Sequence, residues 1–249
     1  MKNLWEGIFK TFAEAGGDLD AFESDIWISK QKDKILSLFA EYEKGNTFSK
    51  DYPLPLVVGG LLAHQRKVSV LDFGGGMGMQ YLDVLGKVPE AEERVEYVIV
   101  DGLATLENTP SFMHKFRNLQ YHSDLDHTHR RFDIVHIGST LQYIENWKSL
   151  LERLIQNYTP IYLVFSDLMA GNIPTFVSHQ IFYDKNVPHL FLNFEDFKRF
   201  LEELGFNIIF KAKFVHKILD QEEIFPNLDL PLRYRLDRSL NVVFQLKTY

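Results

Sequence analysis

The stretch LDFGGGMG, from Leu71 to Gly78, places the carboxylate of Asp72 ahead of four glycines with the spacing D-x-G-x-G-x-G. It follows the apolar run VSVLDFG and precedes MQYLDVLGKV, which has helical periodicity. Glycines at a strand-to-helix turn leave backbone N–H groups bare beside a helix N-terminus, an arrangement suited to a ligand that lies against the main chain. In open α/β sheets ligands bind at such turns, beyond the carboxyl ends of the strands. The stretch therefore predicts a ligand site, although a turn that only brings a helix onto the sheet has the same appearance.

The dinucleotide fingerprint G-x-G-x-x-G fits this stretch poorly. Counting from Gly74 and Gly76, its third place falls on Met79, and counting from Gly76 and Gly78 the spacing is already wrong. The spacing therefore disfavours a nicotinamide dinucleotide.

Histidines and carboxylates gather in HSDLDHTH, from His122 to His129, which raises the question of a metal site. Their spacing matches no metal-binding motif, and we expect no metal there. His136 lies inside an apolar strand, where a buried histidine satisfied by a hydrogen bond is the simpler interpretation.

These residues need an alternating set of elements to position them. After a helical segment at PLVVGGLLAHQ, strands and helices follow one another, and near-continuous apolar strands indicate a mostly parallel, doubly wound sheet. The five predicted strands are Val68 to Gly74, Val95 to Asp101, NLQYHSD, Phe132 to Ser139 and Pro160 to Asp167.

The two ends of the chain depart from this alternation. The pattern from Trp5 to Tyr42 predicts helices, so residues 1–50 are expected to form a helical extension of a single unit over 51–249. A long connection, 168–193, carries Phe176, Phe182, Tyr183 and Phe191, which suit either the core or a substrate lid. Beyond the helix EDFKRFLEELGF, two strands with no helix between them predict an antiparallel pair.

Composition narrows the class of protein. The net charge of -7 argues against a nucleic-acid partner, and the absence of cysteine excludes disulfides and thiolate chemistry. No apolar run approaches the roughly 20 residues of a membrane helix, and the N-terminus lacks a secretion signal, so a cytoplasmic protein without membrane insertion is expected.

The first motif, with Asp72, Gly74, Gly76 and Gly78, resembles that of class I S-adenosylmethionine-dependent methyltransferases, from about Val68 to the C-terminus. The resemblance implies a Rossmann-like fold with a seven-stranded, mostly parallel sheet whose last strand is antiparallel. It implies S-adenosylmethionine as cofactor and S-adenosylhomocysteine as product. In that family an acid ending the second strand binds the ribose hydroxyls and matches Asp101. An acid after the third strand contacts the adenine and matches Asp124.

The same resemblance extends the cofactor site to further residues beside these motifs. They are Phe73, Gly75, Gly102, Leu125, Gly138 and Ser139. LDFGG, the later STLQYI and a glutamine in FVSHQIF are also similar to an uncharacterised bacterial subfamily of methyltransferases.

Methyl transfer requires close, in-line placement of the acceptor and, at oxygen or nitrogen, a base. We expect His179, then Asp167, as the base, with Tyr143 and Gln142 as positioning groups; a surface role for His179 is the alternative. The predicted function is methylation of a small molecule or sugar, at oxygen or nitrogen in preference to carbon. An NAD(P)-type oxidoreductase and a non-catalytic cofactor-binding or scaffold protein are the alternatives. The sequence fixes neither the acceptor nor the oligomeric state.

Overall fold

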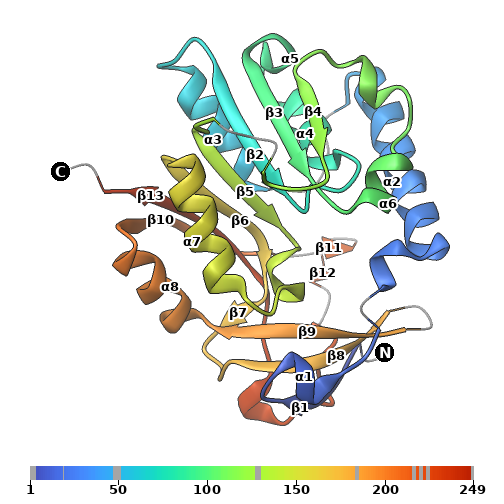
Figure 1. The fold of residues 1–249 in the computed structure, drawn as a ribbon, viewed down its shortest axis with the longest axis vertical. Helices are drawn as coiled ribbons and strands as arrows, with labels where there is room; N and C mark the ends of the chain where they lie inside the picture. The colour runs from blue at the N-terminus through green and yellow to red at the C-terminus, as the bar shows by residue number, and fades with distance from the viewer. Residues whose placement is uncertain are drawn as a thin grey trace. The chain divides into compact units, whose positions relative to one another are not determined.

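The computed structural model describes residues 4–18, 20–46, 52–126, 130–182, 185–214, 217–218, 221–222 and 225–247. Its main sheet has seven strands in the order β10-β13-β6-β5-β2-β3-β4, and a smaller sheet has the order β1-β8-β9-β7. This is the predicted α/β architecture, mostly parallel with an antiparallel end (Figure 1). No helix among the described residues has the length and apolar character needed to cross a membrane.

The chain divides into two compact units. The glycine-loop unit comprises Phe22–Gly138 and Glu152–Val164, and the small-sheet unit comprises Met1–Ala21, Ser139–Leu151 and Phe165–Tyr249. Two elements, α7 (Trp147–Tyr158) and β6 (Tyr162–Leu168), contribute residues to both.

Parallel strands and short helices build the glycine-loop unit. Strands β2, β3 and β5 are buried along most of their length, as expected for strands covered on both faces, whereas the edge strand β4 is mostly half-buried or exposed. Helix α4 packs against α2 and α3. The elements are η1 (Ala21–Glu23), α2 (Asp25–Glu43), α3 (Pro53–Leu62), β2 (Val68–Phe73), α4 (Met79–Lys87), α5 (Ala91–Arg94), β3 (Val95–Val100), α6 (Leu103–Glu107), η2 (Met113–Lys115), β4 (Leu119–His122) and β5 (Ile134–Gly138).

Local signals set the helix ends in this unit. The Ser24 hydroxyl caps α2 by accepting from the Trp27 amide at 3.3 Å, and Pro53 occupies the first turn of α3, where no N–H is needed.

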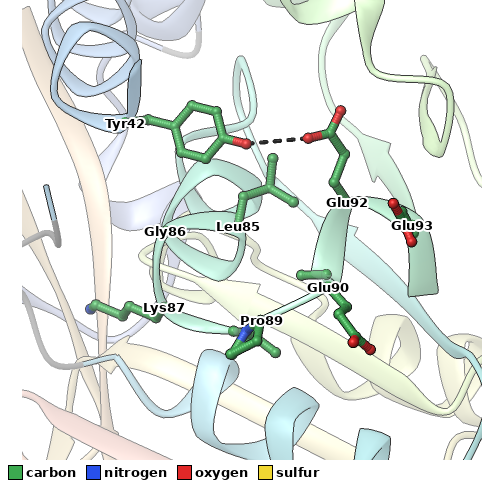
Figure 2. Close-up of a pocket in the computed structure, with 10 residues that line it drawn as sticks. Tyr42, Leu85, Gly86, Lys87, Pro89, Glu90, Glu92 and Glu93 are labelled. Atoms are coloured by element: carbon green, nitrogen blue, oxygen red, sulfur yellow. Dashed lines mark hydrogen bonds between the residues drawn. The ribbon is translucent and has the colours of Figure 1, made fainter. Parts of the chain in front are cut away.

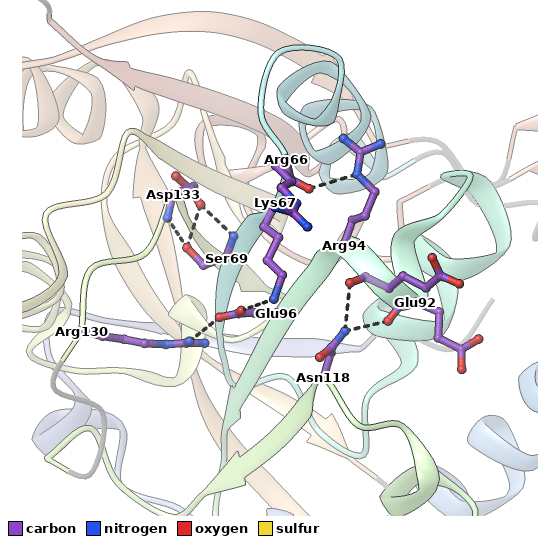
Figure 3. Close-up of polar contacts among 10 residues, drawn as sticks. Arg66, Lys67, Ser69, Glu92, Arg94, Glu96, Asn118, Arg130 and Asp133 are labelled. Carbon is purple, nitrogen blue, oxygen red and sulfur yellow. Dashed lines mark hydrogen bonds and ion pairs between the residues drawn. The ribbon is translucent and has the colours of Figure 1, made fainter.

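Side-chain bonds hold the amino ends of these strands (Figure 3). Glu96 pairs with Lys67 at 3.1 Å and with Arg130 at 2.6 Å. The Asp133 carboxylate accepts from the Ser69 amide and hydroxyl, both at 2.7 Å. The Arg94 guanidinium donates to the carbonyls of residues 62, 65 and 66. These bonds fix where neighbouring strands begin.

Antiparallel strands dominate the small-sheet unit. Asn193 caps α8 by accepting from the Asp196 amide at 3.0 Å, and Gly205, at φ +91°, follows the end of this helix. The elements are β1 (Trp5–Phe9), α1 (Phe12–Ala15), η3 (Leu141–Tyr143), β7 (Ala170–Gly171), β8 (Phe176–Phe182), β9 (Lys185–Asn193), α8 (Phe194–Glu203), β10 (Phe206–Lys213), β11 (Lys217–Ile218), β12 (Gln221–Glu222), η4 (Leu232–Tyr234) and β13 (Leu240–Leu246). The predicted antiparallel pair of final strands is confirmed by β10 and β13.

The structure corrects the prediction for the first residues. Trp5–Phe9 is strand β1, not helix, and pairs antiparallel with β8, with Trp5 opposite Gln180. Gly7 there has φ +77°, which no helix allows. The partner strand is some 170 residues away, so local periodicity could not reveal the pairing.

The long connection 168–193 also contains regular structure. It includes β7, β8 and β9, and Phe176 and Phe191 stack in its core at 4.8 Å between ring centroids. Tyr183, one of the aromatic residues named above, lies outside the described residues.

Candidate functional site

The carboxyl ends of four parallel strands meet at one edge of the glycine-loop unit. In register, Phe73 of β2 lies opposite both Val100 of β3 and Ile137 of β5, and Val100 lies opposite His122 of β4. The Gly74 amide donates to the Val100 carbonyl at 2.8 Å. The predicted cofactor residues of these strands therefore follow one another along a single edge, where ligands bind in open α/β sheets.

The glycine loop adopts backbone conformations that other residues avoid. Gly74, Gly76 and Gly78 have φ of 72°, 59° and 100°, and Gly78 is the N-cap of α4. A Cβ at Gly78 would lie 2.7 Å from the Met113 Cε atom, and one at Gly75 would lie 2.6 Å from the Asp72 Oδ2 atom. At Gly76 nothing lies within 4 Å. The protein's own packing thus explains Gly75 and Gly78, whereas Gly76 has open space beside it for a ligand.

Asp101 is bonded to the loop. Its Oδ2 atom accepts from the Gly76 amide and its Oδ1 atom from the Gly102 amide, both at 2.7 Å. Burial raises the pKa of Asp101, the two amide bonds oppose that rise, and the nearby charge of Asp72 adds to it. The Thr105 side chain also bonds this carboxylate. A carboxylate has about four acceptor sites, so Asp101 can still accept from a hydroxyl group of a ligand.

Asp72 does not point toward the loop surface. Its carboxylate is buried, accepts from the Tyr97 hydroxyl at 2.7 Å and lies 2.7 Å from His136 Nδ1. His136 is thus the hydrogen-bonded buried histidine that its place in the strand predicted. A Cβ at Gly138 would lie 2.8 Å from His136 Cε1, so this glycine also packs on the network.

Asp124 follows β4 in a tight turn. Its Oδ1 atom accepts from the Asp126 amide at 2.8 Å, and the next carbonyl, of buried Leu125, accepts from the Tyr158 hydroxyl at 2.5 Å. The turn holds Asp124 and Leu125 at a fixed place after the strand.

Two strained residues lie in the small-sheet unit. Ser139 and Asp167 are non-glycine residues with φ of 50° and 56°, and the Ser139 hydroxyl donates to Asp167 Oδ2 at 2.7 Å. The Ser239 hydroxyl donates to Asp167 Oδ1, and Asn241 Oδ1 accepts from the Asp167 amide at 3.1 Å. Left-handed non-glycine residues cost roughly 1–3 kcal/mol each and cluster at functional sites. Sequence reasoning missed Ser239 and Asn241, whose only signal was two polar residues at the start of an apolar strand.

The predicted catalytic residues fall into two groups. The Tyr143 hydroxyl donates to Gln180 Oε1 at 2.7 Å, and Gln142 is buried beside it. Burial first, and the charge of Asp167 second, raise the pKa of Tyr143, which keeps the phenol neutral. The structure therefore brings Tyr143, Gln142 and Asp167 together.

His179 lies on the other face of β8. Its Nε2 atom donates to the Ala15 carbonyl at 2.8 Å, and its ring packs on Phe9 at 4.8 Å. Side chains alternate along a strand, so Gln180, which holds Tyr143, faces the opposite way. Buried His189, directly opposite Ser178, lies on the Tyr143 face with 5.3 Å between ring centroids. Sequence reasoning missed His189, because register decides which histidine accompanies Tyr143.

A surface pocket of about 590 Å³ lies elsewhere, at the C-terminal end of α4 (Figure 2). Its lining includes Tyr42, Lys87 and Glu92, and the Tyr42 hydroxyl donates to the Glu92 carboxylate at 3.3 Å. None of the predicted site residues lines this pocket.

The metal question concerns the turn after β4. Within the described ranges no three metal-ligating side chains gather. The residues from His127 to His129 lie outside those ranges, so the expectation of no metal remains a prediction for that segment.

Comparisons with solved structures agree with this architecture. The N1-methyltransferase of 1,6-didemethyltoxoflavin from Burkholderia thailandensis, with that compound and S-adenosylhomocysteine bound, superimposes with TM-score 0.56 at 15% identity, over 92% of this chain and 88% of that one. An S-adenosylmethionine-dependent methyltransferase from Clostridium acetobutylicum ATCC 824 gives TM-score 0.51 at 13% identity, over 87% and 99%. The glycopeptide N-methyltransferase MtfA, complexed with S-adenosylhomocysteine, gives 0.51 at 12%, over 81% and 92%. At these identities the likeness establishes the fold.

Sequence comparison supplies the family. No curated protein matches the chain. The sequence model of the family described as a methyltransferase domain matches residues 32–210, which include the glycine loop, Asp101 and the five predicted strands from Val68 to Asp167. Because that match spans more than half of the chain, the protein belongs to the methyltransferase domain family.

Proposed function

We propose that this protein transfers a methyl group from S-adenosylmethionine to an oxygen or nitrogen atom of a small molecule or sugar. The observation that carries the proposal is the bond between Asp101 and Gly76 at 2.7 Å, which joins the ends of β2 and β3 at the edge where ligands bind. The open space at Gly76 and the remaining lone pairs of Asp101 suit a ribose that lies against the loop.

The residues present fit the cofactor. Asp101 would accept from the ribose hydroxyls, the loop from Gly74 to Gly78 would face the methionine part, and Asp124 with Leu125 would hold the adenine. Phe73, Gly102, Gly138 and Ser139 complete the proposed set, whereas buried Asp72 would act through the loop and not by direct contact.

When bound, S-adenosylmethionine supplies a methyl group on a positively charged sulfur. This chain's residues would hold the acceptor atom toward that methyl group, and a base among them would take up the acceptor's proton as the methyl group leaves sulfur. Holding the acceptor in line is the protein's main contribution, an entropy effect of roughly 7–11 kcal/mol in favourable cases.

Asp167 suits the role of base better than His179. It lies near Tyr143 and is fixed by two hydroxyl donors, Ser139 and Ser239, in a strained conformation. The proton on His179 Nε2 is engaged by a carbonyl, and its ring is on the other face of β8. Neutral Tyr143, with Gln142, would position the acceptor by hydrogen bonds.

The test combines binding with transfer. Calorimetry should show that the wild-type protein binds S-adenosylmethionine and S-adenosylhomocysteine, and that Asp101→Ala weakens both at least tenfold, because ribose hydroxyls lose a charged acceptor worth about 1.5–3 kcal/mol. Glu96→Ala, at the other end of the same strand, is the matched control and should leave affinity unchanged.

Transfer separates an enzyme from a binding protein. Methyl-labelled cofactor, incubated with fractions of a cell extract, should label a small acceptor in the presence of wild-type protein and not of Asp101→Ala. The proposal would be refuted if the protein bound neither S-adenosylmethionine nor S-adenosylhomocysteine. Binding of a nicotinamide dinucleotide instead would favour an oxidoreductase.

A further inference from the structure

A buried polar network underlies the glycine loop. Asp72 of β2 lies between Tyr97 of β3 and His136 of β5, and each neighbour is 2.7 Å from one of its carboxylate oxygens. All three side chains are excluded from solvent. The network therefore spans three adjacent strands just below their carboxyl ends.

Two glycines of the proposed cofactor site rest directly on this network. A Cβ at Gly75 would lie 2.6 Å from Asp72 Oδ2, and a Cβ at Gly138 would lie 2.8 Å from the His136 ring. Asp72 is thus separated from the loop surface only by the backbone of Gly75.

Among the described residues, no lysine or arginine balances the charge of Asp72. Burial and the carboxylate hold the pKa of Tyr97 well above its usual range, so this phenol is neutral. His136 Nδ1 lies 2.7 Å from the other carboxylate oxygen and can donate to it. Within the described part of the chain, neither Asp72 nor Asp101 forms an ion pair with lysine or arginine. Two carboxylates therefore share this edge, and the charge of Asp72 contributes to the raised pKa of Asp101.

We propose that Asp72 is a specificity-determining residue whose buried negative charge favours the sulfonium cofactor over its thioether product. The proposal rests on the function proposed above. S-adenosylmethionine carries one positive charge more than S-adenosylhomocysteine, and the two are otherwise alike at the ribose and adenine. A buried charge is little screened by solvent, so it distinguishes ligands by charge even without contact. Release of the spent product is thereby favoured.

Calorimetry on Asp72→Asn tests the proposal, because the amide keeps the shape and removes the charge. We expect affinity for S-adenosylmethionine to fall about tenfold and affinity for S-adenosylhomocysteine to change less than about twofold, the size of effect expected for one charge at partial screening. Asp101→Asn is the matched comparison. It should weaken binding of S-adenosylhomocysteine strongly, where Asp72→Asn does not, because its proposed partners, the ribose hydroxyls, are common to both ligands.

A second measurement does not depend on the variant's folding. In the wild-type protein, the ratio of the two affinities should stay constant from low salt to about 1 M salt. At 1 M the Debye length is only about 3 Å, so exposed charges are screened, whereas a buried charge is not. A ratio that falls severalfold with salt would assign the discrimination to exposed carboxylates and overturn the proposal. Equal loss of both ligands in Asp72→Asn would overturn it as well. If the wild-type protein binds neither ligand, it is the proposed function that fails.

Discussion

Carboxylates at the two ends of the parallel strands in the glycine-loop unit have opposite surroundings. At the amino end of β3, Glu96 pairs with Lys67 and Arg130. The hydrogen bond from Lys67 first, and that from Arg130 second, hold the pKa of Glu96 below its usual value. At the carboxyl end of the same strand, Asp101 is bonded by two backbone amides and by the Thr105 side chain, and no lysine or arginine pairs with it among the described residues. Burial raises its pKa. Carboxylates satisfied by cations stabilise the fold, whereas those without cations are available to a ligand.

The pH dependence of stability should therefore differ in sign between the two ends. Glu96, with a lowered pKa when folded, contributes stability above the unfolded pKa and loses it as pH falls. Asp101, with a raised pKa, is favoured when protonated, and that contribution is lost as pH rises through the folded pKa. Ionised Asp101, at the carboxyl end, thus lowers stability at neutral pH.

The largest expected effect comes from adding a methyl group at Gly75, directly against the Asp72 carboxylate. Gly75→Ala should destabilise the protein by about 1–3 kcal/mol, because the new methyl group meets a carboxylate that Tyr97 and His136 hold in place. Thermal unfolding measures the change. Gly60→Ala in α3 is the control: nothing lies within 4 Å of its Cβ position, and alanine there should gain roughly 0.5–1 kcal/mol. If Gly75→Ala left the stability unchanged, the hydrogen-bonded network of Asp72, Tyr97 and His136 would not be rigid.

The second effect concerns the pH dependence of cofactor binding. As pH falls through the raised pKa of Asp101, its carboxylate gains a proton and loses its charge and part of its acceptor capacity. Affinity for S-adenosylhomocysteine should therefore fall by up to about tenfold per pH unit below that pKa. Calorimetry across the acid range measures it, with circular dichroism to establish that the fold persists. Asp101→Asn should bind weakly and without this dependence; a similar slope in the variant would assign the titration to another group.

The smallest effect belongs to the amino end. Glu96→Gln should cost no more than about 1 kcal/mol at neutral pH, since its ion pairs are partly exposed. The difference from wild type, measured by urea unfolding, should vanish below the usual carboxyl pKa range, where Glu96 is protonated in both folded and unfolded chains. A difference that persists in acid would mean that packing of the side chain, and not its charge, supports this end.

Local patterns were sufficient for the parallel strands and their helices. VSVLDFG and VEYVIVD are apolar almost throughout and form β2 and β3 as predicted, because strands buried on both faces need no distant information to be recognised. WEGIF was misread because its strand character depends on β8, which lies far along the chain. The strands in the connection 168–193 depend on mutual pairing in the same way.

The sequence by itself determined the α/β alternation and the glycine-loop motif. Runs of apolar residues indicate buried strands and glycines indicate left-handed backbone, and both signals are local. Only the tertiary structure decided that Gly75 and Gly78 are required by the protein's own interior, that Asp72 lies below the loop with Tyr97 and His136, and that His179 and Tyr143 are on opposite faces of one sheet. These facts follow from strand order and register, which join residues that no local pattern connects.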